Sequence, residues 1–179
     1  GREFCADSVI GVGGGSVLDI CKLVAALIDS EQQVEVLFGI GFVARKGCWF
    51  ACMPTTAGTG SEVSPNAILL DERDKLKKGI VSPYLIADVA YVDPQLTITV
   101  PAKITAETGM DALTHAIEGY ITAGAWELSD MFHLKAIEII ARSLRSALNG
   151  EAAVMEGIQN RVPKCRHISG FIIAGDDQG

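Results

Sequence analysis

The chain has 179 residues, and 49% of them are hydrophobic, which is enough apolar material for one domain or two small ones and excludes a disordered chain. Its net charge of -7 argues against nucleic acid or an anionic membrane as the main partner. No apolar run approaches the roughly 20 residues that cross a bilayer. The five cysteines are odd in number and form no CxxC pair, so we predict reduced thiols in a cytoplasmic protein.

The first predicted element is a short, buried β-branched strand at residues 8–12, which leads into three glycines and then a helix. Ser16 and Asp19 have the spacing of a capping box, so we expect them to cap this helix. Residues 29–47 are polar and rich in glycine, and they predict a loop with at most a short helix. The first helix is indicated by residues that recur at helical spacing from residue 18 onward: Leu18, Cys21, Lys22, Ala25 and Ile28.

A second buried strand is predicted at residues 48–53, where a proline ends it. A loop of small and hydroxyl residues follows at 55–62. Next come two apolar runs at 66–70 and 78–82 around a charged turn, which predict a β-hairpin, and a further strand at 88–92.

Past Pro101 the β-branched runs give way to helical spacing, so we place a domain boundary near residue 103. Helices are predicted at 108–120 and at 128–148, where Asn149-Gly150 supplies a stop. Residues 151–179 show poor periodicity and predict no particular element.

The glycine turn at residues 13–16 has two interpretations. Glycines between a strand and a helix let backbone N–H groups approach a phosphate, and the helix dipole favours negative charge there. The usual dinucleotide fingerprint has a third glycine where Ser16 stands, so a plain tight turn is the alternative. The loop at 55–62 follows a second strand, and two such loops at one sheet edge favour a cofactor site over a plain polar loop.

Asp111 and His115 are spaced i, i+4, so they project from one face of a predicted helix. Carboxylate and imidazole groups suit divalent iron or zinc, although a complete site takes three or four ligands. The alternative is that Thr108 and Asp111 form a capping box and His115 simply pairs with Asp111. Of the other histidines, we expect His133 to be structural and His167 to be solvated.

Several stretches together resemble the iron-dependent (group III) alcohol dehydrogenases, in the branch of lactaldehyde reductase and the propanediol dehydrogenases. The stretches that carry the resemblance are Val12-Gly-Gly-Gly-Ser-Val-Leu-Asp19, Pro54-Thr-Thr-Ala-Gly-Thr-Gly-Ser-Glu-Val63 and Thr108-Gly-Met-Asp-Ala-Leu-Thr-His-Ala-Ile-Glu-Gly-Tyr120. The resemblance implies an α/β fold class: a partial dinucleotide-binding (Rossmann-like) domain over 1–103, followed by the start of an all-helical, metal-binding domain over 104–179.

The resemblance also implies roles for individual residues. The positions that match the family's pyrophosphate site are Gly13, Gly14, Gly15 and Ser16, with Asp19 nearby. Those that match the rest of its cofactor site are Thr55, Thr56, Thr59, Asn66 and Lys77, with Lys78 as the alternative lysine. Asp111 and His115 match the first two metal ligands.

The function so implied is an oxidoreductase that transfers a hydride between a primary or secondary alcohol, or its aldehyde or ketone, and NAD or NADP, with Fe²⁺ or Zn²⁺ as Lewis acid. The expected partner is a small-molecule alcohol or aldehyde, and the full-length form is expected to be a homo-oligomer. Family members are longer at both ends and take two further metal ligands from later helices, so the chain resembles a fragment. An inactive truncated remnant with weak nucleotide or metal binding, or a glycerol dehydrogenase-like relative, is the alternative.

Overall fold

The computed structural model of the protein describes residues 5–148 and the strand at 170–173. Two compact units divide the chain: the first is drawn from Gly1–Thr55, Gly60–Asp93 and Ser169–Gly179, and the second from Thr56–Thr59 and Pro94–Ile168. The first unit combines a largely parallel sheet with a helix, and the second is mainly helical, so the predicted fold class is confirmed. The functional limits 1–103 and 104–179 stay a prediction, because compactness does not test which part binds which group.

The larger sheet has strands in the order β1-β3-β6-β7: Ser8–Gly13, Trp49–Pro54, Val89–Val92 and Gly170–Ile173. β1, β3 and β6 are parallel and confirm the three predicted strands, whereas β7 is antiparallel to β6 and was not predicted. The register pairs Gly13 with Pro54, so β1 and β3 end at the same edge of the sheet.

The smaller sheet has the order β2-β5-β4, and its strands are Gly39–Ile40, Leu76–Val81 and Asn66–Asp71. β4 and β5 form the predicted antiparallel hairpin, whose turn places Lys75 at φ 58°. The two-residue strand β2 carries no periodicity of its own, which is why the sequence predicted only a loop there. Short 3-10 helices occupy Val34–Val36, Ser61–Val63, Pro83–Leu85 and Pro94–Thr97.

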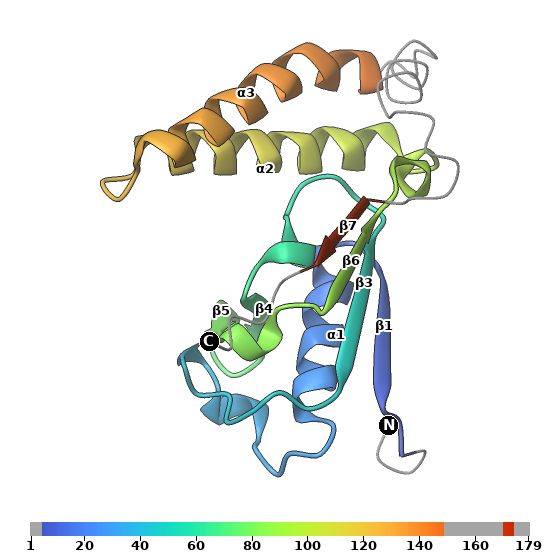
Figure 1. Ribbon diagram of the computed structural model, residues 1–179, viewed down its shortest axis with the longest axis vertical. Helices are drawn as coiled ribbons and strands as arrows, with labels where there is room; N and C mark the ends of the chain where they lie inside the picture. The colour runs from blue at the N-terminus through green and yellow to red at the C-terminus, as the bar shows by residue number, and fades with distance from the viewer. Residues whose placement is uncertain (1–4, 149–169, 174–179) are drawn as a thin grey trace. The chain divides into compact units, whose positions relative to one another are not determined.

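Helix α1 (Gly15–Leu27) packs against both sheets (Figure 1). Burial on two sides explains why a single helix supports two clusters of apolar residues. The cluster toward the larger sheet contains Leu18, Ala25, Phe50, Cys52, Ala87 and Ala90. The cluster toward the hairpin contains Leu23, Ala26, Leu37, Val43, Ala67, Ile80 and Leu85.

The predicted capping box at the start of α1 is wrong. Gly14 is the N-cap, no side chain caps the helix, and Ser16 already lies in its first turn. Asp19 lies further along, buried at 8% exposure, and its carboxylate accepts hydrogen bonds from a distant segment instead. The capping-box prediction was wrong because Gly14 is the N-cap and the helix already begins at Gly15, so Ser16 is not at the N-cap position.

Strand β1 was predicted to be buried, and the structure corrects this on one face. Val9 packs with the α1 cluster and Gly11 is buried. The alternate side chains Ile10 and Val12 are 60% and 52% exposed. Among the strands that the structure describes, β1 neighbours β3 only, so this edge and this apolar face are open with respect to those strands.

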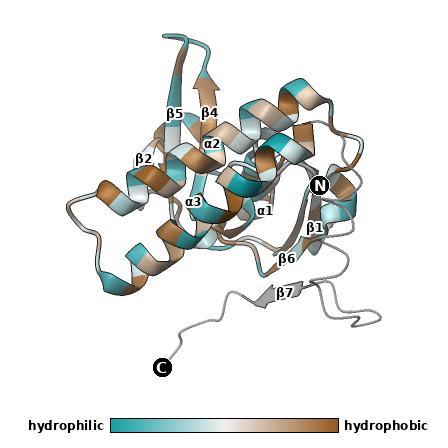
Figure 2. Cartoon of the chain, turned by 90° about the horizontal axis from the view of Figure 1, so that it is seen from above, coloured by the Kyte–Doolittle hydropathy of each residue, from teal (hydrophilic) through white to brown (hydrophobic). Residues whose placement is uncertain are grey.

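The second unit contains helices α2 (Ala102–Ile121) and α3 (Glu127–Leu148), which lie side by side (Figures 1 and 2). Glycines allow the close approach: a Cβ on Gly109 would lie 2.3 Å from Leu144 Cδ1, and one on Gly119 would lie 2.2 Å from His133 Nε2. This contact supports the structural interpretation of His133.

Helix α2 begins well before the predicted residue 108. Pro101 precedes its first residue, and the amide of Thr105 donates to the Pro101 carbonyl over 3.0 Å. Proline favours a helix start, and this was the signal that the sequence interpretation overlooked. The capping-box alternative for Thr108 and Asp111 is therefore wrong, since both residues lie inside the helix.

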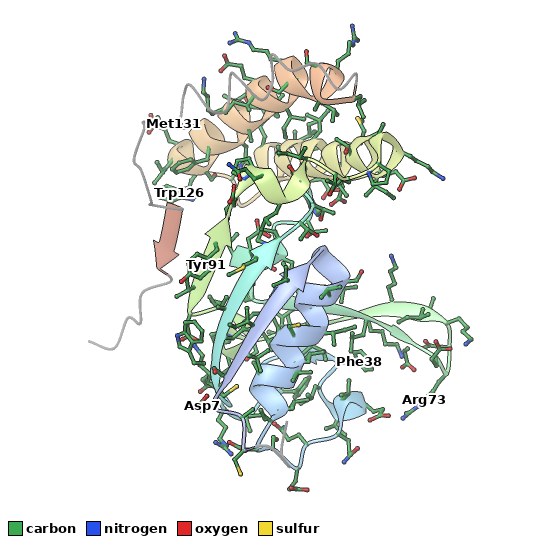
Figure 3. The ribbon with its side chains drawn as sticks, turned by 90° about the vertical axis from the view of Figure 1, so that its right-hand side faces the viewer. Asp7, Phe38, Arg73, Tyr91, Trp126 and Met131 are labelled. Atoms are coloured by element: carbon green, nitrogen blue, oxygen red, sulfur yellow. The ribbon has the colours of Figure 1, made fainter. Side chains whose placement is uncertain are left out.

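The helical unit exposes large apolar side chains. Trp126 and Met131 are 63% and 64% exposed, and both are labelled in Figure 3. In Figure 2 the hydrophobic positions alternate with hydrophilic ones along α2 and α3. Within the described ranges, no helix combines the length and the hydropathy that a membrane crossing requires.

The cysteines that the structure describes are unpaired, as predicted. They are Cys5, Cys21, Cys48 and Cys52. Cys165 and His167 lie outside the described residues.

Candidate functional site

The N-terminus of α1 is open to a ligand. Val17 and Leu18 donate their amides to the Gly14 carbonyl over 3.0 and 3.1 Å, whereas the amides of Gly15 and Ser16 have no partner among the described residues. Free N–H groups at a helix start, together with the helix dipole, favour a phosphate. The glycine turn thus has the geometry of an anion site, and the role of Gly13, Gly14, Gly15 and Ser16 stays a prediction.

Gly13 is required for this turn on steric grounds. A Cβ added to it would lie 2.7 Å from the Cβ of Val17, closer than side chains tolerate. The close contact with Val17 lets the strand end turn directly into the helix.

The second predicted loop begins beside the glycine turn. The amide of Thr55 donates to the carbonyl of Gly13 over 2.9 Å, which confirms that the two loops leave one edge of the sheet. Thr56 and Thr59 belong to the second unit, where Gly58 lies against Thr108 of α2. A Cβ on Gly58 would lie 2.7 Å from the Thr108 carbonyl oxygen, so only glycine fits.

A buried ionic network connects α1 to the segment after this loop. Asp19 Oδ1 accepts a hydrogen bond from Ser61 Oγ at 2.6 Å, and Asp19 Oδ2 accepts one from the amide of Ile68 at 3.0 Å. Lys22 Nζ lies 3.6 Å from Asp19 Oδ1, and the Lys22 side chain is 0% exposed. Burial lowers the pKa of the Lys22 ammonium, and the neighbouring Asp19 carboxylate opposes this shift.

Sequence reasoning placed Lys22 among the residues at helical spacing in the first helix but missed its role. The signal that could have found it is its place at helical spacing with Leu18 and Ala25, where a charged residue interrupts an apolar side. A lysine at such a position is either solvated at the edge of the stripe or fully paired inside, and only the packed structure distinguishes the two.

The hairpin residues fall on its two faces. Asn66 pairs with Val81 and Leu70 pairs with Lys77, so strand alternation puts Asn66 and Lys77 on the same face. Lys78 points to the other face, where its Nζ lies 2.7 Å from Asp71 and 2.6 Å from Asp74.

Lys78 is fully engaged on that opposite face. Its ammonium also lies 5.5 Å from the ring centre of Phe38, a residue labelled in Figure 3. Hydrogen bonds to Asp71 and Asp74 raise the pKa of Lys78. Lys77 has no ion pair among the described residues, which favours Lys77 over Lys78 as the lysine available to a ligand.

Asp111 and His115 lie on one face of α2, as their spacing predicts. His115 Nδ1 lies 3.6 Å from Asp111 Oδ2, and the two side chains are 57% and 44% exposed. Both groups are donors that divalent iron or zinc accepts. In the described part of the chain no third histidine, cysteine, aspartate or glutamate joins them. The pair therefore fits a metal chemically but supplies two ligands.

Comparison with known proteins gives two consecutive matches. The model of the iron-containing alcohol dehydrogenases matches residues 1–94, and the model of the C-terminal region of the Fe-containing alcohol dehydrogenase family matches residues 105–159. The chain belongs to the iron-containing alcohol dehydrogenase family. The second match extends well beyond Tyr120, where the last of the matching motifs ends.

Individual relatives agree with this assignment. Lactaldehyde reductase of Escherichia coli K12 is 43% identical over 148 residues, and long-chain-alcohol dehydrogenase 1 of Geobacillus thermodenitrificans is 47% identical over 150 residues. Each match covers 82% of this chain, but only 39% and 38% of the respective relative. The solved structure of sulfoacetaldehyde reductase from Bifidobacterium kashiwanohense in complex with NAD⁺ matches with a TM-score of 0.78 and 35% identity, and covers 86% of this chain and 42% of its own.

Proposed function

We propose that this chain contributes to an oxidoreductase that transfers a hydride between a primary or secondary alcohol, or the corresponding aldehyde or ketone, and NAD or NADP. The observation that carries the proposal is the uncapped start of α1 next to Thr55, at the shared end of two parallel strands. In a member of this family, such a site has the donors that a dinucleotide pyrophosphate needs. A solved relative in complex with NAD⁺ supports this cofactor class.

The local geometry supports the proposed cofactor-binding roles. The free amides of Gly15 and Ser16 donate to pyrophosphate oxygens, and Gly13 and Gly14 keep side chains out of the way. Thr55, Thr56 and Thr59 offer hydroxyl groups from the second loop.

The hairpin completes the proposed cofactor site. Asn66 and Lys77 present an amide and an ammonium from one face of β4 and β5. The Asp19 carboxylate is occupied inside the protein, so we assign it to the support of the site rather than to direct contact.

Asp111 and His115 are proposed to hold Fe²⁺, or alternatively Zn²⁺. A divalent metal supplies Lewis acidity toward the oxygen of the alcohol or carbonyl substrate. The task of this chain is then to present one carboxylate and one imidazole from adjacent turns of a rigid helix. Their exposure leaves room for further ligands and for the substrate.

We also propose a cytoplasmic location and assembly into a homo-oligomer in the full-length form. Unpaired cysteines support a reducing compartment. The open apolar face of β1 supports association with further polypeptide, because exposed strand edges pair readily.

A chimera tests the proposed function. This chain replaces the matching 148-residue stretch of E. coli lactaldehyde reductase, which supplies the rest of a family-length protein. We expect the folded chimera, loaded with Fe²⁺ or Zn²⁺, to reduce NAD⁺ or NADP⁺ in the presence of short primary and secondary alcohols. A folded, metal-loaded chimera without turnover on any alcohol of the panel would contradict the proposal and favour an inactive remnant.

A further inference from the structure

Lys22 is a charged residue with its whole side chain inside the first unit. Its Nζ donates hydrogen bonds to the carbonyl of Ser64 at 3.0 Å, to the hydroxyl of Ser64 at 3.2 Å and to the carbonyl of Asn66 at 2.6 Å. The Asp19 carboxylate lies 3.6 Å away and balances the charge. The hydrogen bonds of Lys22 and Asp19 therefore join α1 to the chain between Ser61 and Ile68.

A buried ionic network is an energetically unfavourable way to fill the interior between α1 and the hairpin. Burying an ammonium and a carboxylate carries a large desolvation penalty, and apolar side chains of the same size often stabilise a fold as well or better. Unlike apolar side chains, ionic groups form directional hydrogen bonds, which fix the position of their partners. Two of the three Lys22 acceptors are backbone carbonyls, and Asp19 accepts from a backbone amide, so the network specifies the path of the main chain from Ser64 to Ile68.

This path determines where the second loop ends. The loop follows Thr55, whose amide is bonded to Gly13, and it finishes at Gly60, which has φ 63° and starts the 3-10 helix at Ser61. The first end is thus tied to the β1-to-α1 turn by a backbone hydrogen bond, and the second end is tied to helix α1 itself by Asp19 and Lys22. Neither Lys22 nor Ser61 belongs to the residues that the proposed function brings into contact with the cofactor.

We propose that Lys22 is a positioning residue that, together with Asp19, anchors the segment from Ser61 to Asn66 to α1 and so holds the second loop ready for the cofactor. The proposal rests on the proposed NAD(P) site. It predicts that loss of the Lys22 ammonium weakens cofactor binding although Lys22 itself does not contact the cofactor and every side chain that does remains in place.

The experiment uses the full chain and NAD⁺ as the probe. Lys22→Met keeps a side chain of similar length and removes the ammonium. Lys46→Met is the matched control, because Lys46 also forms an ion pair, with Asp88, but does not contact the segment from Ser61 to Asn66. Binding is measured by titration calorimetry at a temperature where circular dichroism shows each variant fully folded. Amide hydrogen exchange is followed over residues 61–68.

We expect Lys22→Met to raise the dissociation constant of NAD⁺ at least tenfold and to accelerate exchange over residues 61–68. Lys46→Met should leave the dissociation constant within a factor of two and exchange over 61–68 unaltered. A merely structural role for Lys22 would lower the melting temperature but leave NAD⁺ affinity of the folded variant unchanged, and this result would overturn the proposal.

Ser61→Ala keeps the proposal testable if Lys22→Met does not fold. It removes a single hydroxyl that donates to Asp19, and we expect a smaller rise of about threefold in the dissociation constant, where an unchanged constant counts against anchoring. A parent chain that binds no NAD⁺ contradicts the proposed function. In that case unaltered exchange over residues 61–68 in Lys22→Met still overturns the anchoring role, and accelerated exchange supports it.

Discussion

The amide of Thr55 donates a hydrogen bond to the carbonyl oxygen of Gly13 over 2.9 Å, and this bond joins the ends of two parallel strands. It brings the first residue of the second loop to the turn that starts α1. The amides of Gly15 and Ser16 follow this turn, and no side chain caps them. The arrangement concentrates donors at one end of the sheet, where anionic cofactors bind in α/β folds.

The first prediction concerns this turn. Gly14→Val places a branched side chain where the backbone must approach a phosphate. In the chimera we expect the dissociation constant of NAD⁺ to rise tenfold or more, which corresponds to about 1.4 kcal/mol. Titration calorimetry on folded protein measures it. Val24→Ala, at an exposed position of α1 away from the turn, is the control and should bind as the parent does.

The second prediction concerns the metal pair. Asp111→Asn and His115→Ala in the chimera should each lower metal content, measured by mass spectrometry, and reduce alcohol oxidation at least a hundredfold. Because the pair is exposed and spaced i, i+4, its contribution to helix stability is only about 0.3–0.5 kcal/mol. Unfolding curves should therefore barely shift. Stoichiometric metal and normal turnover in both variants would identify the pair as an ordinary helix-surface contact.

The third prediction concerns pH. Burial, reinforced by Glu62, raises the pKa of the Cys52 thiol from 9.0 to about 11. The unfolded chain ionises first, so the stabilisation from the protonated thiol is complete below pH 9 and is lost as the pH rises toward 11. The loss is on the order of 2–3 kcal/mol.

Cys52→Ala should reduce this alkaline loss of stability, measured by urea unfolding at several pH values. Burial also raises the pKa of Cys21 and Cys48, so part of the loss should persist. Cys5→Ser replaces an exposed thiol and serves as the control. If the Cys52→Ala and parent curves stay parallel between pH 8 and 11, the thiol does not ionise differently in the two states.

The fourth prediction concerns association of the chain. Ile10 and Val12 form an exposed apolar stripe on an edge strand, and such edges pair with further polypeptide. We expect the parent chain to form oligomers or aggregates in light scattering, and Ile10→Lys with Val12→Lys to shift it toward monomer. Substituting the similarly exposed Val36 and Phe42, which lie outside the strands, with lysine is the control. A monomeric parent with a cooperative thermal transition would contradict the prediction.

Much of the fold follows from local chemistry. The short β-branched strands, the glycines that start α1, the charged turn of the hairpin and the spacing of α2 and α3 each depend on neighbours within a few residues. The family motifs are equally local, and they indicate Gly14, Thr55, Asp111 and the other candidate residues without information on packing. Local patterns failed at the start of α2, where the proline signal at residue 101 was overlooked, at the cap of α1, and for the strands β2 and β7, which were not predicted.

The tertiary structure decided which groups face one another. Asp19 has the sequence spacing of a cap, yet its partner Ser61 is 42 positions away, and no local pattern contains that distance. Lys22 is buried only because α1 packs on the hairpin, and Lys77 is distinguished from Lys78 only by the register of β4 with β5. Sequence alone determined the motifs and most of the elements, whereas burial, charge pairing and strand register arise from contacts between distant segments and exist only once the chain has packed.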